Sequence, residues 1–390
     1  MYEKNIGPFQ VGGIVAPPFF IGRDKELKEM YESLRTLSQN FLVIAPRRVG
    51  KSSLLNFLKR KLENEKNIIV IYLNCRNITN KSNLSTKLIE EFLSEYEKKH
   101  KLKGFLEIFK RAMKDKILST IRTLDQIGGS LGDIGEVYIK FREKEIDEQV
   151  YLEKTLDFIE KFSKEKEIRT IILIDEFQKL NNFNDAIFDL FKNELDIQER
   201  VRYVVTGSSL MLLQDILLKK DSPLYMMFTK IYLEPFDQNI TTDFVKKRLN
   251  KFNIKISQDG LKYIHECTGG IPYYVQKLGQ FCFELSQLTN KSVDKYLVQN
   301  GFERMLREFD EEFESRFLEK FSPKRQAILI EIANRDGARV SEIAFAMGVD
   351  VNFLGESMHF LVESMVLQKQ RRGYYDFFDK VFKAWLSRDM

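Results

Sequence analysis

The sequence predicts an α/β fold in which helices cover both faces of a parallel sheet, followed by a helical region and a small C-terminal domain. Three observations predict it. Up to residue 236, short and fully apolar segments alternate with longer segments whose apolar residues recur every three or four positions. From Pro235 onward only the helical spacing continues, and beyond Phe321 the pattern changes again. Strands that are apolar along their whole length are typical of parallel sheets buried on both faces.

Five segments have the length and composition of buried strands: residues 41–45, 67–75, 170–176, 202–208 and 230–236. Helical spacing is found at 51–62, from about 82 to 100, and near 149–166. Strands that alternate with helices in this way form crossovers between parallel neighbours. We therefore expect residues 1–236 to form one αβα core, with an insertion at 98–150.

Residues 237–320 are expected to be helical throughout. A helix around 302–320 would carry a stripe formed by Phe302, Leu306, Phe309, Phe313 and Phe317. The stripe could be a binding ridge, but apolar residues at helical period more often face a core. We therefore interpret it as core.

Residues 321–390 are expected to form a winged-helix domain. Ser322 is a candidate N-cap and Pro323 suits a first helical turn, so a helix is predicted from there to about Asn334. Two more helical segments follow on either side of the turn 348–350, and two strand-like pieces flank the polar turn 370–373. Helix, turn, helix and hairpin in this order are the winged-helix pattern.

The composition is that of a soluble globular protein. The 390 residues are 43% hydrophobic, and 62 cations against 57 anions leave a net charge of +5. That surplus is too small to indicate nucleic acid by itself. Three scattered cysteines and three isolated histidines argue against a disulfide framework and a zinc site. Because neither a signal-like N-terminus nor an apolar run of about 20 residues occurs, we expect a cytoplasmic protein.

A glycine-lysine-serine sequence lies between the first strand and its helix. Residues 45–52 read APRRVGKS and fit the phosphate-loop pattern G-x-x-x-x-G-K-[ST], except for an alanine at the first glycine. Such a loop wraps backbone N–H groups around phosphates at a helix N-terminus, and the alternative is an ordinary polar turn. The alanine costs little where its φ is negative. The predicted nucleotide-binding residues are Ala45, Pro46, Arg47, Arg48, Val49, Gly50, Lys51, Ser52 and Ser53.

Two carboxylates end the third strand. Four apolar residues precede Asp175, and Glu176 follows it directly. A carboxylate at this place can join the Ser52 hydroxyl in holding Mg²⁺, and its neighbour can orient or deprotonate a water. We therefore predict Ser52 and Asp175 as metal ligands, and Glu176 and Lys51 as catalytic residues; two exposed acids at a strand end are the alternative.

Two further segments carry weaker signals. The fourth strand ends in hydroxyls, which we expect to lie between the phosphate loop and the carboxylates. Ser208 is the predicted catalytic hydroxyl, Thr206 is the alternative, and a helix cap is the structural interpretation. In TGGIPYYV, Gly270 loosens the backbone and Pro272 suits a first helical turn, so a helix end could contact the nucleotide there.

Taken in order, FIGRDKEL, APRRVGKSSLL, ILIDEFQ, VVTGSS, SPLY, LEPF and TGGIPYYV resemble the archaeal ATPase family, a branch of the STAND and AAA+ P-loop ATPases. The resemblance spans about Phe19 to Phe283, and such a protein usually ends in a winged helix. It implies an αβα sheet, a helical lid over residues 237–320, and ATP with Mg²⁺ as cofactors. It also implies that Gly22 and Arg23 lie near the adenine, and that Gly270 and Pro272 form the lid contact.

The sequence departs from the AAA+ pattern in its arginines. Rings of that class hydrolyse ATP with an arginine from the neighbouring subunit. Residues 203–247 contain no arginine, and the family's Gly-Arg after SPLY is Met226-Met227. The lid segment GGIPYYV also lacks the AAA+ lid arginine, as it does in STAND members. Slow, switch-like ATP hydrolysis is therefore expected rather than motor activity.

Three functions compete: an ATP-dependent switch, an ATP-regulated DNA-binding protein, and a nucleotide-binding scaffold with negligible hydrolysis. Glu176 argues against the scaffold. The would-be recognition helix, 351–364, contains two glutamates and neither lysine nor arginine, whereas a helix in a major groove needs cations. Residues 98–116 hold eight cations and two acids, and would contact nucleic acid before the winged helix does; a solvated helix face is the alternative. A protein partner for the winged helix, and an oligomer, fit the switch.

Overall fold

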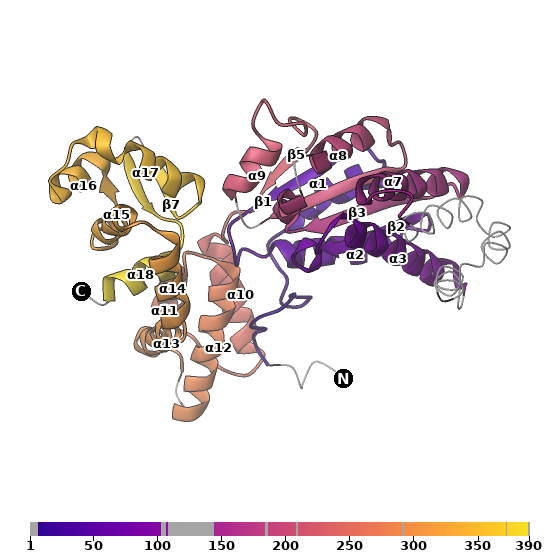
Figure 1. The fold of residues 1–390 in the computed structure, drawn as a ribbon. Helices are drawn as coiled ribbons and strands as arrows, with labels where there is room; N and C mark the ends of the chain where they lie inside the picture. The colour runs from indigo at the N-terminus through magenta and orange to yellow at the C-terminus, as the bar shows by residue number, and fades with distance from the viewer. Residues whose placement is uncertain are drawn as a thin grey trace. The chain divides into compact units, whose positions relative to one another are not determined.

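The computed structural model describes residues 7–102, 107, 144–183, 186–207, 210–290, 292–371 and 373–388. By its contacts the chain divides into two units. The first contains Met1–Gly22, Pro46–Gly50 and Glu234–Met390, and the second contains Arg23–Ala45 and Lys51–Leu233. Figure 1 labels most of their helices and strands.

A five-stranded sheet forms the centre of the second unit, in the order β2-β3-β4-β1-β5, and all of its pairs are parallel. The strands are β1 (Phe41–Ile44), β2 (Ile68–Asn74), β3 (Arg169–Asp175), β4 (Val201–Gly207) and β5 (Thr229–Tyr232). The helices are α1 (Asp24–Arg35), α2 (Lys51–Glu63), α3 (Lys81–His100), α7 (Glu148–Glu165), α8 (Ala186–Ile197) and α9 (Leu210–Leu217). In Figure 1, α2 and α3 lie on one side of this sheet and α8 on the other. The predicted α/β fold with a parallel sheet is confirmed.

The central strands are buried because helices cover both of their faces. Every residue of β1 is buried, and so is every residue of β3 after Arg169. The strand ends differ from the prediction, most of them by a single residue. The third strand stops at Asp175 because Glu176 adopts a left-handed backbone with φ 58°, and the fifth stops at Tyr232 instead of 236.

The first unit is mainly helical. Its helices are α10 (Gln238–Asn250), α11 (Gln258–Thr268), α12 (Pro272–Thr289), α13 (Lys295–Glu308), α14 (Asp310–Lys320), α15 (Pro323–Ala333), α16 (Val340–Met347), α17 (Val351–Glu363) and α18 (Lys380–Arg388). A small antiparallel sheet has the order β6-β8-β7 and consists of β6 (Ala338–Arg339), β7 (Leu367–Arg371) and β8 (Tyr374–Phe377).

The helix expected at 302–320 is two helices, with Phe309 between α13 and α14. Three acids, Asp310, Glu311 and Glu312, open α14, which is where a helix dipole favours negative charge. The aromatic stripe is core, as interpreted from the sequence. Phe309 is 5% exposed and Phe313 is fully buried.

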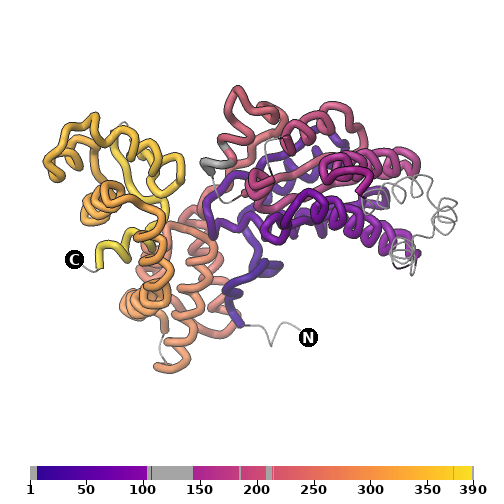
Figure 2. Tube along the Cα trace, viewed as in Figure 1, coloured from indigo at the N-terminus to yellow at the C-terminus, as the bar shows by residue number. Residues whose placement is uncertain are grey.

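One hydrophobic core runs through the whole first unit. It includes residues from Phe9 to Leu386 and continues across the expected boundary at 321. Figure 2 shows the C-terminal segment returning to the orange helices, and α18 contacts α11, α14 and α15. On α18, the Trp385 ring lies 5.9 Å from that of Phe313. The two C-terminal regions expected from the sequence therefore share their apolar interior.

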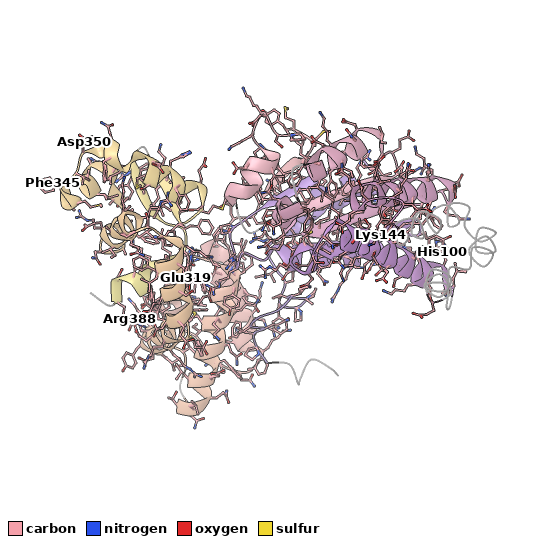
Figure 3. All side chains as sticks on the ribbon, viewed as in Figure 1. His100, Lys144, Glu319, Phe345, Asp350 and Arg388 are labelled. Atoms are coloured by element: carbon pink, nitrogen blue, oxygen red, sulfur yellow. The ribbon has the colours of Figure 1, made fainter. Side chains whose placement is uncertain are left out.

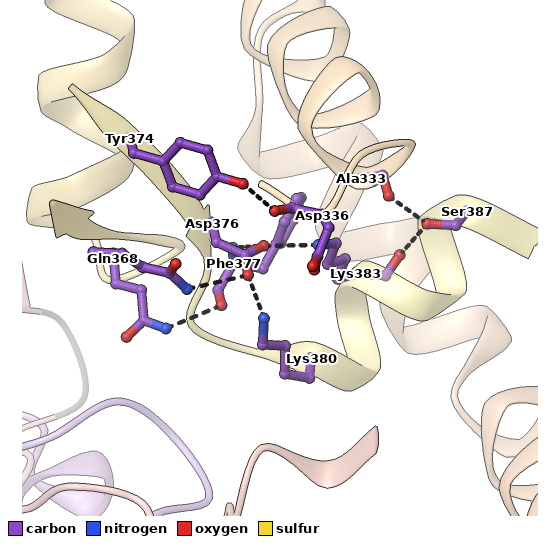
Figure 4. Close-up of polar contacts among 10 residues, drawn as sticks. Ala333, Asp336, Gln368, Tyr374, Asp376, Phe377, Lys380, Lys383 and Ser387 are labelled. Carbon is purple, nitrogen blue, oxygen red and sulfur yellow. Dashed lines mark hydrogen bonds and ion pairs between the residues drawn. The ribbon is translucent and has the colours of Figure 1, made fainter. Parts of the chain in front are cut away.

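A buried carboxylate joins the hairpin of this unit to α18 (Figure 4). Asp376 on β8 is 2% exposed and accepts hydrogen bonds from Lys380 and, at 2.9 Å, from Lys383. Burial alone would raise the pKa of Asp376, but the two lysines hold it below its usual value. At the other end of α18, the Ser387 hydroxyl donates to the Ala333 carbonyl at 2.9 Å. Among the described helices, none is both long and apolar enough to cross a membrane.

Candidate active site

The backbone conformation of the loop between β1 and α2 suits its sequence at the two positions where the pattern has glycine. Gly50 adopts φ 101°, which favours glycine, and α2 begins directly afterwards at Lys51. Arg48 has φ 71° although it carries a side chain. Ala45 is not among the residues with positive φ, so alanine fits the position of the first glycine without strain.

The predicted phosphate-binding lysine lies across its own loop. Lys51 is 7% exposed, and its Nζ donates to the Ala45 carbonyl at 2.6 Å. A buried ammonium group needs acceptors, because leaving its donors unpaired would be costly. The contact joins the two residues that flank the loop Pro46–Gly50.

Three hydroxyl groups surround the Asp175 carboxylate, which is 2% exposed. Ser52 Oγ donates to Oδ2 at 2.6 Å, and Thr206 Oγ1 donates to Oδ1 at 2.6 Å. Tyr72 Oη donates to Oδ2 at 3.2 Å. These contacts form because β4 lies between β1 and β3, and because β2 is the other neighbour of β3. Ser52 and Asp175, the two predicted metal ligands, are in direct contact.

Glu176 is held in a strained and nearly buried position. The residue is 5% exposed and left-handed, a conformation that costs a non-glycine residue about 1–2 kcal/mol. Its carboxylate accepts hydrogen bonds at 2.5 Å from Arg76 Nη2 and at 2.5 Å from Gln178 Nε2. Gly207 makes room for Gln178, since a Cβ at Gly207 would lie 2.0 Å from Gln178 Oε1. Such strain is often found at functional sites.

Local structure places Arg76 beside Glu176. Asn74 and Asp175 are partners in the register of β2 and β3, so the two strands end in line. The short 3-10 helix Cys75–Asn77 follows, and the Asn74 side chain accepts from the Arg76 backbone N–H at 3.0 Å. Sequence reasoning missed Arg76. Its place directly after a buried strand was a usable signal, because the carboxyl ends of parallel strands meet at one edge.

The negative charge of this edge changes the chemistry of its neighbours. Burial and the Asp175 charge raise the pKa of Tyr72, so its hydroxyl stays protonated and donates. Burial, with Asp175 and Glu176 nearby, raises the pKa of the Cys75 thiol to about 12. Cys75 is therefore an un-ionised thiol rather than a nucleophile.

A family model described as an ATPase domain predominantly from Archaea matches residues 20–278, which is more than half of the chain. The chain belongs to this archaeal ATPase family. Its α/β fold is that of the P-loop ATPases, which solved structures share.

Two solved structures share the fold of this archaeal ATPase. The Walker-type ATPase of Pyrococcus abyssi aligns with a TM-score of 0.69 and 19% identity, over 97% of this chain and 99% of that chain. The Aeropyrum pernix ORC2 protein, in ADPNP–ADP complexes, aligns with a TM-score of 0.57 and 12% identity, over 96% of both chains. An uncharacterized protein of Methanocaldococcus jannaschii is 29% identical over 145 residues. That match covers 36% of this chain and spans 31% of the relative.

The other residues predicted to bind the nucleotide or to act in catalysis differ in their burial and in their contacts. Ser208 lies outside the described residues, whereas its alternative, Thr206, contacts Asp175. Arg23 is 6% exposed and forms an ion pair with Glu26 at 3.6 Å. In the loop, Val49 is buried, Pro46 is half-buried and Arg47 is exposed; Ser53 on α2 is buried.

The backbone conformation explains the glycines at two predicted nucleotide-contact positions, Gly270 of the lid segment and Gly22. Gly270 has φ 69°, and a Cβ there would lie 2.0 Å from the Phe236 carbonyl oxygen. Gly22 has φ 68° and lies against the Phe236 ring. Pro272 is the first residue of α12, and the backbone N–H of the next residue, Tyr273, donates to the Arg48 carbonyl at 3.3 Å.

Most of the basic segment 98–116 falls on residues 103–106 and 108–116, outside the described part of the chain. Of its first residues, Lys98 pairs with Glu95 at 3.0 Å. Lys99 donates to the Glu63 carbonyl at 2.7 Å and also to that of Glu65. Lys99 therefore has a structural role in fixing the end of α2.

Proposed function

We propose that this archaeal ATPase binds MgATP at the phosphate loop and hydrolyses it slowly, as a nucleotide-dependent switch. One observation carries the proposal: Ser52 at the start of α2 contacts Asp175, and Glu176 follows at the same strand end. Family membership and the Walker-type fold support nucleotide binding. The ORC2 structure, whose description names ADPNP and ADP, makes an adenine nucleotide the natural ligand to test.

The residues present fit Mg²⁺. The Ser52 hydroxyl and the Asp175 carboxylate are hard oxygen donors, which this ion prefers, and they are already in contact. Bound Mg²⁺ would neutralise charge on the transferring phosphate. Lys51 would stabilise the β- and γ-phosphates, while Glu176 would orient and deprotonate the attacking water. Thr206 fixes the second oxygen of Asp175, and Ser208 is the further hydroxyl that we propose for the γ-phosphate.

Slow turnover is supported by the partners of Glu176. Its carboxylate is engaged by Arg76 and Gln178, so these contacts must loosen before it can accept a proton from water. Residues 203–247 also contain no arginine to act in the way of an AAA+ finger. Both features favour a protein that holds its nucleotide over one that cycles quickly.

We further propose that residues 321–390 are a winged-helix domain that contacts a protein rather than DNA. Phe345 on α16, labelled in Figure 3, is 89% exposed. Phe353 on α17 is 55% exposed. Glu356 on α17 is 91% exposed, and an acid there repels phosphate. Exposed aromatic side chains are typical anchors of protein interfaces. Residues 1–236 would then be the ATPase core, and 237–320 the lid and linker.

DNA binding regulated by ATP is the second function considered. Two cations lie near α17, but both cover aromatic rings: Lys324 lies 3.4 Å from the Phe353 ring centroid, and Arg325 lies 3.5 Å from that of Phe360. Together residues 321–390 hold ten cations and nine anions. This composition gives little electrostatic attraction to a duplex.

Calorimetry with MgATP tests the proposed function. Lys51→Ala removes the side-chain cation directed at the phosphates, and we expect at least a hundredfold loss of affinity, about 3 kcal/mol. Arg60→Ala is the control, because it removes one cation from the exposed face of the same helix. Equal MgATP binding by wild type and Lys51→Ala would show that this loop is not the nucleotide site.

A further inference from the structure

The side chain of Arg48 enters a cage of aromatic rings. Its guanidinium carbon lies 4.6 Å from the ring centroid of Phe309, 5.1 Å from Tyr274, 5.2 Å from Tyr273 and 5.8 Å from Phe313. We call these four residues the aromatic cage. All belong to the first unit, which also contains Pro46–Gly50. Cations over aromatic faces are attracted by the ring quadrupoles, the more so when partly removed from water.

Two polar groups complete the cage, the Tyr274 hydroxyl and the Glu312 carboxylate, and Glu312 is counted as a cage residue from here on. Arg48 Nη1 donates to Tyr274 Oη at 2.5 Å, and Nη2 donates to Glu312 Oε2 at 2.5 Å. The Arg48 side chain is 17% exposed and that of Glu312 is 52% exposed. The guanidinium therefore forms one hydrogen bond to a residue of α12 and one to a residue of α14. Because both involve a charged group, they are stronger than hydrogen bonds between neutral groups.

The backbone of Arg48 explains why such contacts are needed. With φ 71°, this residue holds a left-handed conformation that side chains disfavour, and such strain persists only where the surroundings enforce it. The cage holds the side chain, and Tyr273 N–H binds the Arg48 carbonyl at 3.3 Å. Left-handed residues within a loop turn successive N–H groups toward one point, which forms an anion-binding nest.

We infer that Tyr274 and Glu312 are positioning residues for the phosphate loop, acting through Arg48. They hold the loop in its phosphate-binding shape, and the inference rests on the proposed binding of ATP there. Tyr274 Oη also donates to Asp379 Oδ2 at 2.8 Å, and the same carboxylate accepts from Phe382 N–H at 3.0 Å on α18. By linkage, a ligand that requires this loop shape also stabilises the cage and the start of α18.

Substitutions in the cage test the inference through MgATP affinity. Glu312→Gln and Tyr274→Phe each leave a side chain of the same shape, and we expect each to weaken MgATP binding about three- to tenfold. Glu311→Gln is the matched control: its exposed acid is the neighbour of Glu312 in the first turn of α14, and its affinity should stay within twofold of wild type. Thermal unfolding of each variant establishes that it folds. If Tyr274→Phe does not fold, Glu312→Gln alone tests the inference.

Substitutions of Arg48 distinguish positioning from general support. In Arg48→Ala, residue 48 has lost its contacts with the cage, and an alanine still disfavours the left-handed backbone. In Arg48→Gly the same contacts are lost, but glycine adopts this backbone without steric cost. We expect Arg48→Gly to bind MgATP more tightly than Arg48→Ala, and Glu312→Gln to add no further loss in either background.

Three results would decide against the inference. Affinities of the two cage variants within twofold of wild type would overturn it, as would equal losses with and without Arg48. A higher affinity in Arg48→Ala than in Arg48→Gly would also contradict it. Failure of the wild type to bind MgATP would instead refute the proposed function, and the inference with it.

Discussion

The guanidinium of Arg76, just beyond β2, meets the carboxylate of Glu176, just beyond β3, with 2.5 Å between Nη2 and Oε1. The Arg76 side chain is 56% exposed and that of Glu176 is 7% exposed, so water reaches the pair from one side. Exposed pairs of this kind contribute at most about 1 kcal/mol. The contact is therefore strong enough to orient Glu176 and weak enough to break during a catalytic cycle.

Removal of this partner should speed hydrolysis. We expect Arg76→Ala to raise the rate of phosphate release up to about fivefold, because Glu176 no longer has to leave an ion pair of about 1 kcal/mol. Arg76→Lys keeps the charge and should stay near the wild-type rate. Single-turnover release of phosphate measures both. A fall in rate with Arg76→Ala would instead assign Arg76 a direct part in the reaction.

Glu176→Gln should separate binding from chemistry. The amide cannot take a proton from water, so we expect phosphate release to fall at least a hundredfold while MgATP affinity is kept. Asp189→Asn is the control, since it neutralises an exposed acid on α8. Calorimetry and phosphate release together measure the effect. Undiminished turnover would move the role to another group, with Gln178 the first to test because it contacts Glu176 at 2.5 Å.

The stability of the second unit should depend on pH through Glu194. Burial raises the pKa of this α8 carboxyl from 4.5 to about 7, with Gln198 lowering it and Asp157, Glu153 and Glu160 on α7 raising it. Because the folded pKa exceeds the unfolded one, the stabilisation is complete below pH 4.5 and is lost as pH rises through 7. Between pH 5.5 and 8 we expect a loss of about 1–2 kcal/mol from this group.

The variant Glu194→Gln should lack that loss, since the amide does not titrate. Denaturant unfolding at both pH values measures it, and the change in stability with pH should shrink by about 1–2 kcal/mol. Glu199→Gln serves as the control, since the Glu199 side chain is 75% exposed. An unchanged pH dependence in Glu194→Gln would show that the carboxyl titrates near its usual value.

Charge substitutions should separate the two candidate DNA surfaces. Lys369→Gln with Arg371→Gln, on β7 of the hairpin, should leave any duplex affinity and its salt dependence unchanged. Lys98→Gln with Lys101→Gln and Lys103→Gln should reduce both if the protein binds duplex DNA; Lys99 is spared because it supports the end of α2. Titrations at several salt concentrations measure the slope. Loss of affinity in the hairpin variant would indicate that residues 321–390 bind DNA.

Much of the fold followed from the sequence because local patterns encode it. The run ILID placed Asp175 at a buried strand end, and GKS placed Lys51 and Ser52 at a helix start. The contact between Ser52 and Asp175 then follows from parallel topology. The break at Phe309 did not follow, since the apolar spacing continues across it and the acids of α14 were the sole hint.

Other parts of the site depend on contacts between residues far apart in the chain. Arg48 meets Tyr274 and Glu312 more than 200 positions later, and periodicity contains no information on such pairs. The left-handed backbone of Glu176 could not be predicted either, because the sequence Asp-Glu does not show whether the glutamate continues the strand or follows its end. The predicted role of Ser208 stays a prediction.

The single core of the first unit has a consequence for how the protein is made. Its members range from Phe9 to Leu386, and α18 supplies Val381, Phe382, Trp385 and Leu386. A ribosome synthesises these four side chains after the other members of the core, so α11, α14 and α15 keep apolar surface uncovered until α18 has emerged. Long-range contacts of this kind also slow folding. The parallel sheet can close while the chain is still being made, but this helical unit becomes complete only when its first and last core residues, Phe9 and Leu386, enter one interior.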